Sequence, residues 1–318
     1  MRRLDLSLAA GVTLAGETSL QVAASLFWPA GDAVPQTALV CLPGGNMNRA
    51  YYDLRAADGD TSFSFAEAMT ARGFLVVTID YLGLGGSSKP ADCYALLPEL
   101  LTAAAANAAT QVLDGLRAGS LSAELPAIPA LRSIGVGHSM GAMMTTLLQA
   151  ATRLHAAVAL LGFSTRGLPD YLPAPVRELS REQQRAQLPA LARQLFVAQY
   201  PVIRSSGNGA EIYGSAKADP RGVAALKAAT DCLLPVTAYL SMLPGNVAPE
   251  AEQIEVPVFL GLGTRDMAGP PHAIPAAFPK SLDVTLHLLP ETGHSHFLFP
   301  TRARLYDRLA HWAHSVLA

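Results

Sequence analysis

Hydrophobic and polar positions follow two alternating patterns along this chain. Short runs rich in Val, Ile and Leu alternate with longer Ala- and Leu-rich segments, which is typical of an α/β protein with a mostly parallel sheet. Several short runs are continuously hydrophobic, as expected for strands buried on both faces. The pattern predicts strands over residues 19–27, 37–42, 74–79, 132–137, 156–161, 256–262 and 284–289, and helices over residues 63–72, 95–118, 140–154 and 302–315.

The stretch over residues 163–253 departs from this alternation. It holds two long helical patterns, over residues 177–199 and 221–241, and no run typical of a buried strand. Between them, residues 204–209 indicate an exposed loop, since Ser, Gly and Asn dominate there. We therefore expect a helical insertion between two strands. Its larger side chains either line a pocket or pack the insertion onto the sheet; these are Phe196, Tyr200, Tyr213, Tyr239 and Met242.

The composition gives no sign of a charged partner. Of 318 residues, 50% are hydrophobic and 15% are charged, and the 23 basic and 25 acidic side chains leave a net charge of −2. The hydrophobic share is enough for a large buried core. The near-zero net charge argues against nucleic acid or an anionic membrane as a partner. We expect one core domain over residues 1–162 and 254–318, with residues 163–253 inserted. The oligomeric state stays open, with a homodimer as one option.

The cysteines and the first residues favour a cytoplasmic protein. Cys41, Cys93 and Cys232 are odd in number and show no Cys-x-x-Cys spacing, so we expect free structural thiols. Two arginines near the start precede an apolar run that Asp5 and Ser7 interrupt, which argues against a secretory signal peptide. No stretch is long and apolar enough to span a bilayer.

Residues 137–141, with the sequence GHSMG, carry the strongest chemical signal. This Gly-x-Ser-x-Gly motif follows a predicted strand and precedes a predicted helix, the context in which a sharp turn exposes a nucleophilic serine. Glycines are needed because the neighbouring chain passes too close for side chains. We therefore expect Ser139 to be the nucleophile, and His138 to be a packing or hydrogen-bonding residue rather than the base.

A nucleophilic serine needs a base and a group that orients the base. Asp266 follows the strand after the insertion, at the sheet edge where α/β active sites collect, with Asp170 as the alternative acid. His294 follows the last strand directly after a glycine, with His296 as the alternative base. The order along the chain, serine then acid then histidine, matches the order that accompanies this motif.

Residues 42–47, with the sequence LPGGNM, are candidates for an oxyanion hole. Glycines after a strand allow backbone N–H groups to converge on one point. We expect the N–H groups of Gly45 and Met140 to be the donors, with Asn46 as the alternative to Gly45. A plain Pro-Gly-Gly turn is the other interpretation of this segment.

These motifs together resemble the α/β-hydrolase superfamily over nearly the whole chain. The resemblance rests on residues 43–45, on residues 80–87 as an Asp-x-x-Gly-x-Gly-x-Ser loop, and on Ser139, Asp266 and His294. It implies a sheet of eight strands flanked by helices, with a helical cap between the sixth and seventh strands. Residues 163–253 match that cap.

Two details refine the resemblance. Many members have a histidine before the glycines where this chain has Pro43, so the resemblance does not decide which backbone N–H points into the site. Haloalkane dehalogenases and epoxide hydrolases of the superfamily carry an aspartate nucleophile, and Ser139 argues against both.

The expected activity is hydrolysis of an ester or lactone of a hydrophobic small molecule through an acyl-enzyme, with no cofactor or metal. Alcohols leave more readily than amines, which favours esters. The same residues would also serve an amidase, a thioesterase, a carbon–carbon bond hydrolase or an acyltransferase. A hydrolase-like protein that binds its ligand without turnover is the alternative from another class.

Overall fold

The protein is built around one mostly parallel sheet of eight strands. The computed structural model describes residues 1–17, 19–31, 33–202 and 217–318. The strands lie in the order β1-β2-β4-β3-β5-β6-β7-β8, with antiparallel β1–β2 and β2–β4 pairs and parallel pairs from there on. The predicted fold class is confirmed. The strands are β1 (Arg2–Ala9), β2 (Gln21–Trp28), β3 (Thr37–Leu42), β4 (Leu75–Ile79), β5 (Arg132–His138), β6 (Ala157–Leu161), β7 (Val258–Gly263) and β8 (Val284–Leu289).

The edge strand β1 is one that the hydrophobic pattern does not predict. From Leu4 onward, its side chains alternate between half-buried and exposed positions. An edge strand with one solvated face has this alternating pattern rather than a continuous hydrophobic run. Asp5 and Ser7, which interrupt the apolar run in the sequence, lie at its exposed positions. This strand completes the eight that the resemblance implies.

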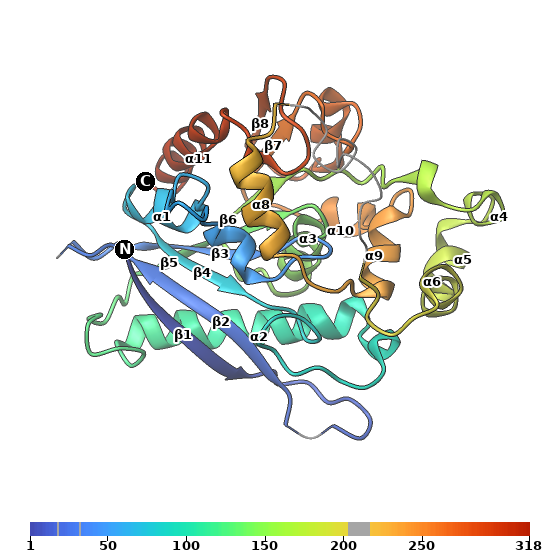
Figure 1. Ribbon diagram of the computed structural model, residues 1–318, viewed down its shortest axis with the longest axis horizontal. Coiled ribbons are helices and arrows are strands. Elements are labelled where there is room, and N and C mark those ends of the chain that lie inside the picture. The colour runs from blue at the N-terminus through green and yellow to red at the C-terminus, as the bar shows by residue number, and fades with distance from the viewer. Residues whose placement is uncertain (18, 32, 203–216) are drawn as a thin grey trace.

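Helices cover both faces of the sheet (Figure 1). On one face lie α1 (Phe65–Thr70) and α11 (Arg302–Val316), and on the other lie α2 (Pro98–Ala118) and α3 (Met140–Thr152). Each matches its predicted range within a few residues. The prediction starts α2 too early, because Pro98 lies in its first turn, where a backbone N–H has no helical partner to lose.

The central strands are buried on both faces, which explains their continuous hydrophobic runs. Val40 and Val77 belong to the core beneath α2 and α3, while Leu39 and Val76 belong to the core beneath α1 and α11. Successive side chains of a strand point to opposite faces, so each strand contributes to both cores. The sheet is therefore a rigid support for the residues at its carboxyl edge.

Between β6 and β7 the chain has an insertion, residues 163–253. Its described part, residues 163–202 and 217–253, contains helices and no strand. The predicted loop at residues 204–209 lies outside the described residues. The α-helices are α4 (Ala174–Arg177), α5 (Arg181–Ala186), α6 (Leu188–Phe196), α8 (Pro220–Ala228), α9 (Pro235–Met242) and α10 (Ala248–Ala251). Helices α4, α5, α6, α9 and α10 lie on the right of Figure 1, and α8 lies nearer the centre.

The prediction of two long helices in the insertion is wrong. The 177–199 pattern is broken into separate helices, with Ser180 capping α5 and Pro189 in the first turn of α6. The 221–241 pattern is broken before Pro235, which starts α9. Proline lacks a backbone N–H and its ring clashes with the preceding turn, so each proline starts a new helix rather than continuing one.

Candidate active site

Ser139 occupies the sharp turn between β5 and α3. Its backbone φ of 55° and ψ of −123° lie where side chains rarely occur. A Cβ at Gly137 would collide with the carbonyl of Gly141, and a Cβ at Gly141 with the carbonyl of Leu42. The N–H of Ser139 donates to the carbonyl of Leu161 at 2.8 Å, which fixes the turn. Ser139 thus lies at the carboxyl edge of the sheet and at the N-terminus of α3, where the helix dipole favours negative charge.

Ser139, His294 and Asp266 form a continuous line of hydrogen bonds. The Oγ of Ser139 is 2.8 Å from Nε2 of His294, and Nδ1 of His294 is 2.8 Å from Oδ1 of Asp266. The three residues follow β5, β8 and β7, so the parallel strands carry them to one edge. A carboxylate only accepts hydrogen bonds, so Nδ1 carries the ring proton and Nε2 accepts from the serine hydroxyl.

Asp266 is buried and held ionised, with its side chain 1% exposed. Burial acts to raise the pKa of Asp266, but attraction to His294 and hydrogen bonds from His294 and His296 outweigh it and hold that pKa well below its usual range. The N–H of Ala268 also donates to Oδ1, at 3.0 Å. Gly162, which sequence reasoning missed, leaves room for this pair: a Cβ there would lie 3.2 Å from Asp266 Oδ2 and from His294 Nδ1.

The structure separates the alternative acids and bases. His294 contacts the serine, whereas the Nε2 of His296 is 2.9 Å from Oδ2 of Asp266. Asp170, the alternative acid, is 79% exposed and lies 3.7 Å from Arg166. The structure therefore places His294 and Asp266 at Ser139 and leaves Asp170 at the surface.

His138 supports the turn that carries His294. It is fully buried, and its Nε2–H donates to the carbonyl of His294 at 2.8 Å. Burial lowers the pKa of His138 well below its usual value, and the neighbouring His294 and His296 lower it further. Its ring lies 4.7 Å from the ring of Tyr51. The expected hydrogen-bonding role of His138 is confirmed.

Comparison with known proteins decides the family. The model of the alpha/beta hydrolase family matches residues 39–304, which include the serine, the acid and the histidine just described. The chain belongs to the alpha/beta hydrolase family. None of the curated proteins matches it.

Solved structures share the fold of this alpha/beta hydrolase at low sequence identity. DcsB in complex with a substrate analogue is 15% identical over 100% of both chains, with a TM-score of 0.65. The monoacylglycerol lipase of Paleococcus ferrophilus is 16% identical over 94% of this chain and 100% of its own, with a TM-score of 0.61. The malate-bound thermophilic esterase of Thermogutta terrifontis is 13% identical over 98% and 99%, with a TM-score of 0.58. These identities support a shared fold.

The loop after β3 lies against the serine of this alpha/beta hydrolase. A Cβ at Gly44 would be 3.3 Å from Cβ of Ser139, and one at Gly45 would be 4.0 Å from Sδ of Met140. Asn46 has a φ of 59°, in the left-handed region. Among the described residues, the N–H groups of Gly45, Asn46 and Met140 have no hydrogen-bond acceptor. All three expected donors are therefore free, and the choice between Gly45 and Asn46 stays a prediction.

A cavity of about 40 Å³ adjoins Ser139 and His294. Apolar side chains dominate its lining, among them Phe163, Leu168 and Met267. The insertion residues suggested from the sequence are not part of that lining. Phe196, Tyr200, Tyr239 and Met242 pack against the hydrophobic core instead, and Tyr213 lies outside the described residues.

The residues over 80–87 form a tight turn after β4. Asp80 is fully buried and forms an ion pair with Arg49, whose backbone N–H also donates to Asp80 Oδ1 at 2.6 Å. The N–H of Gly86 donates to Oδ2 at 2.8 Å. Burial raises the pKa of Asp80, and these donors oppose it only in part. Gly85 has a φ of 54°, and a Cβ there would collide with the Asp80 carboxylate, so the turn requires glycine.

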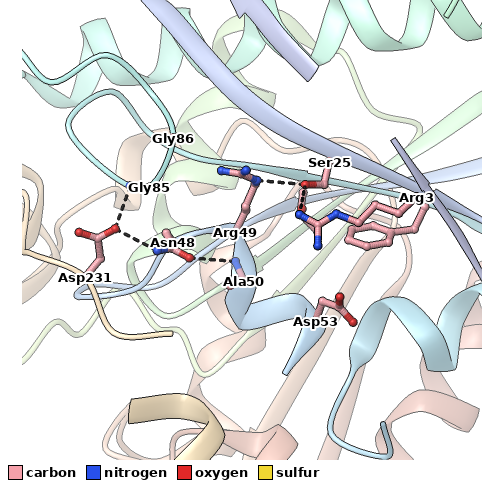
Figure 2. A pocket seen from close by; sticks show the side chains of 11 residues that line it. Arg3, Ser25, Asn48, Arg49, Ala50, Asp53, Gly85, Gly86 and Asp231 are labelled. Atoms are coloured by element: carbon pink, nitrogen blue, oxygen red, sulfur yellow. Dashed lines mark hydrogen bonds between the residues drawn. The ribbon is translucent and has the colours of Figure 1, made fainter. Parts of the chain in front are cut away.

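Asp231, in the insertion, joins three segments beside a cavity of about 420 Å³ (Figure 2). Its Oδ2 accepts from Nδ2 of Asn48 at 3.0 Å and from the N–H of Gly85 at 2.8 Å, and its Oδ1 accepts from the N–H of Cys232 at 2.7 Å. Burial acts to raise the pKa of Asp231, but these hydrogen bonds outweigh it and lower that pKa. Sequence reasoning missed Asp231, because no local motif marks it.

Cys41, Cys93 and Cys232 are buried and unpaired, as expected. In the part of the chain that the structure describes, no helix has the length and apolar character needed to cross a membrane. Within the same residues, no group of three or more His, Cys, Asp or Glu side chains is arranged to hold a metal ion.

Proposed function

We propose that this alpha/beta hydrolase is a serine hydrolase that cleaves a carboxylic ester or lactone of a hydrophobic small molecule through an acyl-enzyme. The hydrogen-bond line from Ser139 through His294 to Asp266 carries the proposal. A serine hydroxyl is a weak nucleophile, and a base with an orienting carboxylate is the arrangement that activates it.

In the first step, Ser139 Oγ attacks the substrate carbonyl carbon while Nε2 of His294 takes the hydroxyl proton. The tetrahedral intermediate then collapses, the bond to the leaving oxygen breaks, and the imidazolium returns the proton to that oxygen. Asp266 stays ionised and stabilises the imidazolium. Its low pKa supports this role, because a protonated carboxyl would supply no negative charge.

In the second step, water attacks the acyl-enzyme while His294 takes a proton from it, and the acid product leaves as Ser139 regains its proton. The N–H groups of Gly45 and Met140 hold the oxyanion in both steps. Their lack of acceptors supports this role, since donors that are already oriented and unpaired cost no reorganisation.

The lining of the cavity at Ser139 supports a hydrophobic substrate. Phe163, Leu168 and Met267 surround it, and the serines Ser164 and Ser241 already donate to backbone carbonyls. A polar substrate would find few free partners there. The insertion, residues 163–253, acts as the cap over the site and contributes part of this lining.

The test is a hydrolysis panel of matched esters, lactones, thioesters, amides and carbon–carbon bonded diketones, with the Ser139→Ala variant as control. We expect turnover of an ester or lactone in the wild-type protein and loss of that turnover in the variant. Adding an alcohol or amine acceptor distinguishes hydrolysis from acyl transfer. Preferred turnover of an amide, a thioester or a diketone, or acyl transfer in place of hydrolysis, would overturn the ester assignment. No turnover of the whole panel would favour a ligand-binding protein.

A further inference from the structure

We propose that His296 is a positioning residue that holds the Asp266 carboxylate so that its other oxygen stays on His294. The inference rests on the proposed serine hydrolase chemistry. His296 touches neither the serine nor the space where a substrate would react. It acts through Asp266.

Both oxygens of the carboxylate are bound by histidines from one turn. His294 lies 2.8 Å from Oδ1 and His296 lies 2.9 Å from Oδ2 of Asp266. The His296 side chain is 0% exposed and that of Asp266 is 1% exposed, so water cannot replace either contact. A carboxylate with one oxygen unbound would be able to rotate about the Cβ–Cγ bond. A carboxylate bound at both oxygens keeps a single orientation.

The proton on His296 can be placed from its partners. Because a carboxylate only accepts, Nε2 of His296 carries a proton. Its Nδ1 is buried and has no hydrogen-bond partner among the described residues. A second proton on Nδ1 would therefore be a buried donor without an acceptor, which is costly. The hydrogen bond to Asp266 Oδ2 is therefore the one that the His296 ring makes within the described residues.

Within the described residues, the groups that surround His296 are Asp266 and His294, His138 and the aromatic core. Its side chain contacts Asp266 after β7, and its ring centroid lies 5.8 Å from that of His138 at the end of β5. Its backbone N–H donates to the carbonyl of His294 at 3.1 Å. The next residue, Phe297, stacks on Tyr51 at 4.9 Å, which anchors the turn in the aromatic core. The His-x-His spacing thus puts two donors on one carboxylate.

Replacing His296 by Leu, Asn or Gln tests this role. Glutamine places an amide N–H near the position of Nε2 and can still reach Asp266 Oδ2, while asparagine is too short and leucine has no donor. We expect His296→Leu and His296→Asn to lower kcat about 100-fold with KM changed less than about twofold, because a displaced catalytic group is costly even at 1 Å. His296→Gln should recover most of the loss.

A spectroscopic signature separates positioning from general structure. The proton shared by His294 Nδ1 and Asp266 should give a strongly downfield ¹H NMR signal in wild type and in His296→Gln, and a weakened or absent one in His296→Asn. Thermal unfolding of each variant, with exposed His272→Leu as control, checks that the fold is intact. If His296→Leu fails to fold, His296→Asn and His296→Gln decide the question. Both replacements are polar, so kcat can be compared between two folded variants that differ in whether they reach Asp266.

A kcat within about twofold of wild type in folded His296→Asn or His296→Leu, or an equal loss in His296→Gln and His296→Asn, would overturn the positioning role. The Ser139→Ala variant tells this failure apart from failure of the proposed function. If Ser139→Ala is inactive and His296→Asn is fully active, only the positioning role is wrong. If Ser139→Ala keeps its activity, the serine hydrolase assignment itself is wrong.

Discussion

The backbone N–H of Asp231 donates to the carbonyl oxygen of Asn46 at 2.7 Å. Asn46 belongs to the loop after β3 that carries the expected oxyanion donors, and Asp231 belongs to the insertion, so this bond ties the two together. The Asp231 side chain adds bonds to Asn48 in the same loop and to Gly85 in the loop after β4 (Figure 2). The conformation of this loop therefore depends on the insertion.

Asp231→Asn should lower kcat about tenfold with little change in KM. Both carboxylate oxygens now accept hydrogen bonds, so the amide NH₂ would face either the Cys232 N–H or the donors of Asn48 and Gly85, and the loop would shift. Complete loss of an oxyanion donor costs about 100-fold or more, so a displaced donor should cost less. Steady-state kinetics on the best ester measures this. The matched control is Asp219→Asn, which keeps a side-chain oxygen to cap α8 and should leave kcat unchanged.

Removing members of the serine, histidine and aspartate line should reduce kcat unequally. Ser139→Ala and His294→Ala should each lower kcat by about 10⁶-fold, and Asp266→Asn by about 10⁴-fold, because the carboxylate orients the base and is not itself the nucleophile. Activity measured over a wide range of enzyme concentration checks this order. An Asp170→Asn variant that loses more activity than Asp266→Asn would contradict the assignment of the acid.

Gly141→Ala should prevent the turn at Ser139 from forming. The added methyl group would overlap the carbonyl oxygen of Leu42, which is backbone and cannot swing away. We expect a loss of at least about 3 kcal/mol in the free energy of unfolding, measured by urea denaturation. Gly31→Ala is the matched control, because a Cβ there meets no atom within 4 Å. Equal stability of the two variants would show that the backbone at Gly141 does not lie against the carbonyl of Leu42.

Stability should fall as the pH is lowered from about 6.5. Burial lowers the pKa of His155 to about 3. The unfolded chain therefore takes up a proton on this residue at a higher pH than the folded protein does. In the interval between the two pKa values the stability should fall by up to about 1.4 kcal/mol per pH unit.

The variant His155→Gln should flatten this dependence, since it removes the buried titrating ring beside Ser133. Urea denaturation at several pH values between 7 and 4 measures the slope. The control is His272→Gln. His272 is exposed, so this variant should keep the wild-type dependence of stability on pH. A wild-type slope in His155→Gln would show that other groups cause the acid sensitivity.

The central fold and the three aligned residues could be predicted because each depends on a local signal. The strands buried on both faces appear as continuous hydrophobic runs, and the turn at Ser139 appears as glycines on either side of one serine. Asp266 and His294 each follow a recognisable strand. Parallel strands bring their carboxyl ends to one edge, so residues that follow the predicted strands are expected to lie at that same edge.

The features that could not be predicted depend on contacts between distant segments or on weak local patterns. The edge strand β1 has alternating exposed and half-buried side chains instead of a continuous hydrophobic run. Pro189 and Pro235 interrupt helical patterns that otherwise appear unbroken. The contact of His296 with Asp266 spans 30 positions, and nothing in the spacing tells which of two histidines faces the serine. The His296 contact follows from packing, which the sequence pattern does not contain, whereas the helix breaks at Pro189 and Pro235 are local signals that the hydrophobic pattern alone does not show.

The most direct test of the account is the mass of the intact protein after exposure to a fluorophosphonate, with Ser139→Ala treated in parallel. Such a reagent phosphonylates a serine that a neighbouring base has activated. The account predicts one adduct on the wild-type protein and none on Ser139→Ala. An adduct that persists in Ser139→Ala, or a wild-type protein that gains none, would contradict an activated nucleophile at Ser139.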